Sequence, residues 1–450
     1  MTGSGRRGAG IGRRALLGSG LAAGAVTAGA AVAGCTAQDG AARGQATPAA
    51  PPFNPADWES VRAQFPLDTR YAQFAAFVLA AHPAPVRRAI EAHRDALDRD
   101  TDAYLHGPDR EQEARHAAAE YLGARNADEI VLTDSTTMSL GLLYSGLRLA
   151  PGQDVLTTEH DFYSTHEGLR MLAARTGAKV RRVRLYEDPA RASADEIVDR
   201  LRRALRPRTR VVAVTWVHSS TGVRLPIRAI ADMLAEANRD RDERDRALLC
   251  VDGVHGFGAV DAGVDDLGCD FLATGTHKWL FGPRGTGLLW GRDWSVLDPL
   301  IPPFAQPAFS AWIGGGEPPK GPGGQLLTPG GYHTFEHRWA LREAFEFHAR
   351  IGRARVAARI AEQATRLKQG LAELPGARLI TPLDPELSAG IVCVVLPGVN
   401  PTTAVERLRQ RHRVIASVTP YRERYVRFGP SMVTTPEQVD QVVRAVAALT

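Results

Sequence analysis

Residues 270–279 read DFLATGTHKW and residues 281–287 read FGPRGTG, and these two stretches form the most informative motif of the sequence. The apolar run at 271–274 is typical of a buried strand, and Lys278 follows it in a turn flanked by glycines. A lysine just after a strand can reach a ligand at the edge of a sheet. The chain has only four lysines beside 51 arginines, so few amines could serve as a nucleophile.

A second strand end lies twenty-six residues earlier, where residues 248–252 read LLCVD. Pyridoxal 5'-phosphate (PLP) needs a lysine that binds it covalently and an acidic partner for its ring nitrogen. Asp252 would keep that nitrogen protonated, and Lys278 would act as a general base once a substrate displaces it. The pair therefore predicts a PLP enzyme with Lys278 and Asp252 as catalytic residues.

Strand-like and helical stretches alternate between about residues 110 and 295, which predicts an α/β domain with a mainly parallel sheet flanked by helices. This large domain is expected to span residues 56–333, and the length of 450 residues allows two or three compact units. We expect strands at 129–133, 154–158, 180–185, 211–217, 248–252, 271–274 and 287–290, and helices at 136–147 and 162–176.

A smaller α+β domain is expected at residues 334–450. A Pro- and Gly-rich connection at 300–333 reads as irregular and leads into a long helix at 335–373 with a break near Gly352. After it we expect strands at 390–396 and 425–428, a helix at 403–411 and a last helix from Pro436.

Residues 1–34 are predicted to be an export signal. Arg13 and Arg14 precede a charge-free, Ala- and Gly-rich stretch, and a paired arginine is typical of the twin-arginine route. Cys35 follows Val-Ala-Gly and predicts a lipid anchor on a flexible linker at 35–55. A retained membrane helix and an ordinary cleavage site are the alternatives. The protein is thus expected to be extracytoplasmic or membrane-anchored.

The net charge of +5 is no sign of a nucleic-acid partner. Four of the 55 basic residues lie in the first 34 residues, so 51 basic residues face 50 acidic ones in the rest of the chain. Cys250, Cys269 and Cys393 each lie in or beside an apolar run, and no CxxC motif accompanies them. We expect buried thiols, no disulfide framework and no metal site.

Taken together, the stretches around Lys278 and Asp252 and the order of the predicted elements make the sequence resemble the class V aminotransferase family, from about Tyr71 to the end of the chain. Residues 277–287 match the block HKW-x-x-GP-x-G-x-G of its isopenicillin N epimerase-like group. The resemblance implies PLP as cofactor and the PLP-dependent transferase fold type I, with a large α/β domain and a smaller C-terminal α+β domain. It also implies a small amino substrate and a homodimer.

The family's phosphate loop matches residues 132–138, LTDSTTM, at a strand-to-helix junction. Backbone N–H groups at a helix N-terminus suit a phosphate, so the resemblance implies that Ser135, Thr136 and Thr137 bind it. Thr334 resembles the threonine that reaches the phosphate of a neighbouring subunit.

Other residues around the cofactor follow from the same resemblance. His160 matches the catalytic ring that stacks on the cofactor, and Ser219 or Ser220 matches a loop beneath it. His255 resembles the residue near the phenolic oxygen. The cofactor-binding set is completed by Thr276 and His277 next to Lys278.

Arg427 is the predicted substrate anchor. Residues 426–430, VRFGP, match the family's R-x-S-x motif, although Gly429 replaces the common serine. The family arginine binds the substrate α-carboxylate, and a guanidinium suits that task because its planar fork binds a carboxylate through two hydrogen bonds.

Desulfurase activity is disfavoured, because residues 413–426 contain no cysteine and Cys393 lies inside an apolar run. Aminotransfer is the leading prediction, while epimerisation or racemisation and β-elimination stay open. All three begin with the same proton abstraction, and the motifs do not identify the later step. An exported lipoprotein that only binds amino compounds is the non-enzymatic alternative.

Overall fold

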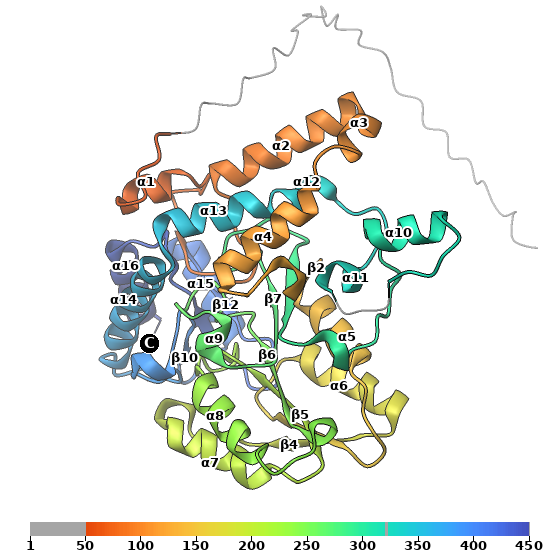
Figure 1. Cartoon of the computed structure of the whole chain (residues 1–450). Helices are drawn as coiled ribbons and strands as arrows, with labels where there is room; N and C mark the ends of the chain where they lie inside the picture. Colours follow the sequence, from red (N-terminus) through yellow and green to blue (C-terminus); the bar gives the residue numbers. More distant parts are fainter. Residues whose placement is uncertain (1–50, 320–322, 450) are drawn as a thin grey trace, which may run out of the picture. The chain divides into compact units, whose positions relative to one another are not determined.

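The computed structural model describes residues 51–319 and 323–449 (Figure 1). The predicted signal at 1–34, Cys35 and most of the linker lie outside the described residues. Within the described part, no helix is long and apolar enough to cross a membrane. In the same ranges no group of His, Cys, Asp and Glu side chains is arranged to hold a metal ion.

The predicted α/β fold is confirmed by a seven-stranded sheet with the order β2-β8-β7-β6-β5-β3-β4. All neighbouring pairs are parallel except those of β8, which runs antiparallel to both β7 and β2. The strands are β2 (Ile130–Thr133), β3 (Asp154–Thr158), β4 (Lys179–Val183), β5 (Thr209–Thr215), β6 (Leu248–Asp252), β7 (Phe271–Gly275) and β8 (Gly287–Gly291).

Helices cover both faces of this sheet because its central strands are apolar on both sides. Val211 and Ala213 of β5 pack with α5 (Thr136–Gly146) and α6 (Tyr163–Thr176). The alternate residues Val212 and Val214 belong to the opposite core. That core includes side chains of α4 (Arg110–Leu122), α7 (Ala194–Ala204), α8 (Ile227–Ala237), α9 (Val264–Leu267) and α13 (Leu341–Ile351).

The C-terminal part contains a four-stranded antiparallel sheet with the order β12-β13-β10-β9. Its strands are β9 (Arg378–Leu379), β10 (Val392–Val395), β12 (Ser417–Val418) and β13 (Val426–Phe428). Helices α14 (Arg353–Ala372), α15 (Pro401–His412) and α16 (Pro436–Ala447) contribute to the same core. The N-terminal segment also joins this part, since β1 (Ala72–Gln73) pairs with β11 (Val414–Ile415). The division of the chain at residue 333 stays a prediction.

The long helix expected at 335–373 is three helices. The break at Gly352 is confirmed, because Gly352 has φ of 95° and separates α13 from α14. A further break at Ala340 separates α12 (Phe335–Trp339) from α13. Within the described residues near the N-terminus, four α-helices precede β2. They are α4 and, before it, α1 (Trp58–Ala63), α2 (Ala84–Arg99) and α3 (Thr101–Leu105).

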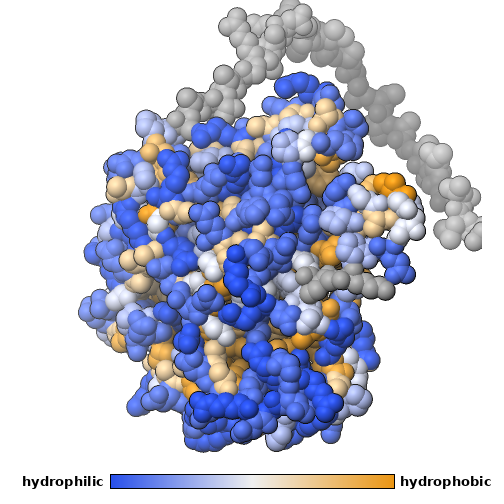
Figure 2. All heavy atoms as spheres, viewed as in Figure 1, coloured by the Kyte–Doolittle hydropathy of each residue, from blue (hydrophilic) through white to orange (hydrophobic). Residues whose placement is uncertain are grey.

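The connection at 300–333 is less irregular than predicted, because it contains α10 (Gln306–Ile313) and α11 (Gly324–Leu327). Pro307 lies in the first turn of α10, where a missing N–H breaks no helical hydrogen bond. Trp312 and Ile313 on this helix are largely exposed. Figure 2 shows the resulting hydrophobic area over α10.

Candidate active site

A cavity of about 300 Å³ lies where the predicted motifs meet. Most of its wall comes from turns that follow strands of the large sheet, and the rest comes from the N-terminal segment and the small sheet. The motif residues that line it are Ser135, Thr136, Thr137, Ser219, Asp252, His255, His277, Lys278 and Arg427.

Asp252 is the last residue of β6, and Lys278 follows the neighbouring strand β7. Burial lowers the pKa of the Lys278 amine to about 8; the Asp252 carboxylate raises it and the Arg427 guanidinium lowers it further. Burial also raises the pKa of Asp252 to about 7, although its Oδ1 accepts a hydrogen bond from the Val254 N–H at 3.0 Å. The Lys278 amine lowers the pKa of Asp252 in turn, so the site holds a buried amine and a buried carboxyl group that interact with each other.

Another part of the cavity wall is built from the N-terminus of α5. Ser135 is the N-cap of this helix, and its Oγ accepts a hydrogen bond from the Met138 N–H at 3.1 Å. The Thr136 Oγ1 is buried and has no hydrogen-bond partner within the protein, and the Thr215 Oγ1 in the same cavity wall shares that property. The Thr137 Oγ1 hydrogen-bonds the Ser164 Oγ at 2.9 Å.

These residues fit PLP. The unpartnered Thr136 hydroxyl and the N–H groups of the first turn of α5 suit a phosphate. The Asp252 carboxyl group suits a protonated ring nitrogen, because the positive charge of that nitrogen would stabilise the ionised form of Asp252. Lys278 supplies the amine for the covalent link.

His160 lies outside the cavity wall, and its predicted stacking on the cofactor stays a prediction. Its ring stacks on Tyr186 with 4.0 Å between centroids, and its Nε2 accepts a hydrogen bond from the Leu185 N–H at 3.1 Å. It does not line the cavity, whereas Phe162 does. The intervening Asp161 sets this turn by accepting hydrogen bonds from the Thr157 hydroxyl and from the N–H groups of Thr158 and Thr215.

Three further predicted residues lie outside the cavity wall: Ser220, Thr276 and Thr334. The Thr276 side chain is buried and hydrogen-bonds the Thr286 side chain. Thr334 is the residue before α12, and its role at a neighbouring subunit stays a prediction. Ser219 and His255 line the cavity, and the Ser219 Oγ hydrogen-bonds the Tyr421 hydroxyl at 2.8 Å.

Arg427 on β13 brings the small sheet to the cavity. Its Nη1 donates to the Ser219 carbonyl oxygen at 3.0 Å and its Nε donates to the Ser417 Oγ at 3.1 Å. The guanidinium also lies over the ring of Phe77, at 4.7 Å from the centroid. Phe77 lines the cavity and was not predicted from the sequence, because it belongs to an N-terminal segment without a recognisable motif.

The aminotransferase class-V family profile matches residues 92–441. The chain belongs to the class V aminotransferase family. As expected from the fit of its cavity, this class V protein is a PLP-dependent enzyme of fold type I.

Relatives of this class V enzyme differ in activity. The isopenicillin N epimerase of Streptomyces clavuligerus is 31% identical over 353 residues, which cover 75% of this chain and 84% of that protein. The isopenicillin N epimerase of Amycolatopsis lactamdurans is 30% identical and covers 67% of this chain and 75% of its own length. A probable cysteine desulfurase of Mycolicibacterium paratuberculosis is 27% identical over 69% of this chain and 42% of that protein.

Solved structures share the fold of this class V enzyme. A mutant of C-DES with glycine covalently linked to its PLP cofactor has a TM-score of 0.77 at 22% identity, covering 86% of this chain and 98% of that one. The apo cysteine desulfurase of Thermococcus onnurineus NA1 has a TM-score of 0.73 at 21% identity, and the match covers 87% of this chain and 97% of that one.

The pH dependence of PLP uptake is expected to follow the Lys278 amine. Only the neutral amine attacks the aldehyde, and its pKa is lowered from 10.5 to about 8. The uptake rate of the apoenzyme should therefore rise with pH through about 8 and then become constant. Stopped-flow absorbance checks this. A rate that keeps rising above pH 10 would mean that Lys278 has the pKa of an ordinary lysine.

Proposed function

We propose that this protein is an aminotransferase that acts on an amino acid or an amino-group-containing metabolite. The observation that carries the proposal is a cavity in which Lys278 is poised as a base and Arg427 lies on the wall. Bound PLP supplies an electron sink that stabilises negative charge at the substrate Cα. With PLP bound, Arg427 would bind the substrate α-carboxylate, Asp252 would hold a proton at the ring nitrogen, and Lys278 would take the Cα proton and deliver it to the cofactor carbon that carries the amino nitrogen.

A second base at the reacting carbon has no support among the described histidines of the cavity. The His255 Nδ1 accepts a hydrogen bond from the Trp279 Nε1 at 3.3 Å, so in the neutral ring the proton is on Nε2 and no lone pair is free. Burial holds the pKa of His255 well below its ordinary value. His277 lies at the phosphate end, because a Cβ on Gly275 would contact both the His277 ring and the Thr136 hydroxyl.

Epimerisation is the second candidate, and the two isopenicillin N epimerases at 31% and 30% identity favour it. Holoenzyme should be incubated in deuterated water with a panel of L-amino acids, with and without a keto-acid acceptor. Aminotransfer predicts that keto acid accumulates from the donor over many turnovers only when an acceptor is present, and that without an acceptor at most one keto acid per bound PLP is formed. Formation of the D-isomer without net loss of the amino acid would replace the proposal with epimerisation.

Cysteine desulfuration is not proposed, because the described cysteines Cys250, Cys269 and Cys393 are all buried and none lines the cavity. Burial raises the pKa of the Cys393 thiol to about 12. A thiol at that pKa is almost entirely protonated near neutral pH and is a poor nucleophile.

The anchor role of Arg427 predicts a large loss of substrate binding. In Arg427→Leu, kcat/KM for the best amino acid should fall by about 10²- to 10³-fold, because a buried charge-assisted contact is lost. PLP affinity should stay within about threefold of wild type, since the arginine acts on the substrate carboxylate. Steady-state kinetics and a PLP titration check both values.

Arg424→Leu is the matched control, because Arg424 is exposed and donates to the Thr402 hydroxyl away from the cavity. The activity of this variant should be unchanged. An Arg427→Leu enzyme that keeps its preference for amino acids over the corresponding amines without a carboxylate would disprove the anchor role.

We also propose export by the twin-arginine route, a lipid anchor at Cys35 and a homodimer; the leader sequence and the family resemblance support these. Cell fractionation tests the anchor, since Cys35→Ala should release the protein from the membrane. Equal membrane retention of the variant would contradict lipidation.

A further inference from the structure

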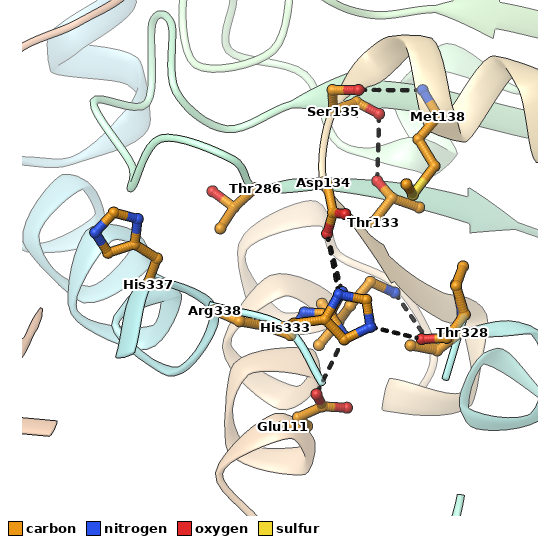
Figure 3. A network of polar contacts seen from close by, with 12 residues as sticks. Glu111, Thr133, Asp134, Ser135, Met138, Thr286, Thr328, His333, His337 and Arg338 are labelled. Carbon is orange, nitrogen blue, oxygen red and sulfur yellow. Dashed lines mark hydrogen bonds and ion pairs between the residues drawn. The ribbon is translucent and has the colours of Figure 1, made fainter. Parts of the chain in front are cut away.

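The turn between β2 and α5 is held from outside the cavity by a buried arginine. The Arg338 side chain on α12 is only 3% exposed. Its Nη2 donates to the Asp134 Oδ1 at 3.0 Å, and its Nη1 donates to the Glu111 Oε1 on α4 at 3.2 Å (Figure 3). The guanidinium therefore ties this turn to two helices that take no part in the cavity wall.

Asp134 is the residue directly before Ser135, the N-cap of α5. The same Asp134 Oδ1 lies 3.7 Å from the His333 Nδ1, so two side chains near α12 approach one carboxylate oxygen. Asp134 itself does not line the cavity, and its side chain is 40% exposed. The Asp134 carboxylate thus lies beside the turn that begins α5, and it contacts Arg338 of α12 and His333 just before that helix.

Helix α12 also contacts the loop that carries Lys278. The His337 Nδ1 hydrogen-bonds the Arg284 carbonyl oxygen at 3.1 Å, and His337 is adjacent to Arg338. Because a carbonyl oxygen can only accept, the Nδ1 donates in this contact. One short helix therefore braces both the turn proposed to hold the phosphate and the loop that bears the reactive amine.

We infer that Arg338 is a positioning residue for the PLP phosphate, an inference that rests on the proposed cofactor site at Ser135–Thr137. It acts in two ways through Asp134. The hydrogen bond fixes the conformation of the turn from which the first N–H groups of α5 point. The guanidinium charge offsets the Asp134 carboxylate, which would otherwise repel a phosphate bound one residue away.

The experiment compares two probes, PLP and pyridoxal, which lacks the phosphate. Apoenzyme of wild type is titrated first, and Arg338→Gln follows. The dissociation constant for PLP should rise by at least about tenfold, because a charge-assisted hydrogen bond is lost and the Asp134 carboxylate loses its guanidinium partner. The constant for pyridoxal should change by less than about threefold, because no phosphate is present to be repelled or misplaced.

Two further variants keep the test decisive. Arg342→Gln is the matched control, since Arg342 pairs with Glu113 on the same helix α4 but makes no contact with Asp134; it should bind PLP like wild type. In Arg338→Gln/Asp134→Asn, an amide pair replaces the ion pair and the carboxylate is gone. PLP affinity should then recover most of the loss. If the double variant binds PLP no better than Arg338→Gln, Arg338 does not act through Asp134.

The outcomes separate this inference from the proposed function. Failure of the wild-type apoenzyme to bind PLP would contradict the proposed function itself. Normal PLP binding by wild type and equal binding by Arg338→Gln would overturn the positioning role alone. Equal weakening of PLP and pyridoxal would also overturn it, because that pattern reports a general loss of structure. Circular dichroism and the melting temperature of each apoenzyme establish that the variants are folded.

Discussion

Lys278→Ala is expected to lose the visible absorbance band of lysine-bound PLP and to lose activity by at least about 10⁴-fold, because covalent attachment and general-base catalysis depend on the same amine. The reason is geometric as well as chemical. Lys278 is the only described lysine on the cavity wall, and it follows the strand next to the one that ends in Asp252. Absorbance after PLP addition and initial rates with the best donor are the measurements.

Lys179→Ala is the control for that experiment, because Lys179 is exposed on the edge strand β4 and does not contribute to the cavity. It should keep both the band and the activity. Persistence of the band in Lys278→Ala would mean that another lysine binds the cofactor.

Asp252→Asn is expected to retain PLP but to lower kcat by about 10²- to 10³-fold, the size of effect seen when one preorganised electrostatic contact is removed from an active site. Asparagine keeps an oxygen that can accept from the Val254 N–H, so the turn after β6 should be preserved. The neutral amide cannot stabilise a positively charged ring nitrogen, so bound PLP would withdraw electrons from the substrate less strongly.

The measurement is kcat at equal PLP occupancy, determined from the absorbance of each preparation. Asp252→Glu serves as the charge-retaining comparison and should be more active than Asp252→Asn. If Asp252→Asn had a kcat within threefold of wild type, a carboxylate at this position would not be needed, and the assigned orientation of the ring would be wrong.

Most of the large sheet could be predicted from the sequence because buried parallel strands are short, continuous apolar runs between turns. The predicted bounds of 154–158 and 248–252 agree with β3 and β6 residue for residue. The antiparallel direction of β8 could not be predicted, since an apolar run looks the same in either direction. Helix α10 was missed because Pro307 reads as a breaker, although a proline in the first turn is compatible with a helix.

The site was predictable where a motif coincided with the end of a strand. Lys278, Asp252 and Ser135 meet at one cavity for that reason. The position of His160 was not predictable, since the local sequence does not show which side chain of a turn faces the cavity, and Tyr186 lies in a different segment. The contact between Arg338 and Asp134 is also invisible in the sequence, because 204 residues separate the partners.

PLP is expected to be bound covalently to Lys278 and to no other lysine. The most direct measurement is borohydride reduction of the wild-type holoenzyme, followed by proteolysis and mass mapping of all four lysines. We expect one pyridoxyl adduct per chain, on the peptide that contains Lys278. An adduct on Lys179, Lys320 or Lys368 with Lys278 unmodified, or no adduct on a protein that has been supplied with PLP, would contradict it.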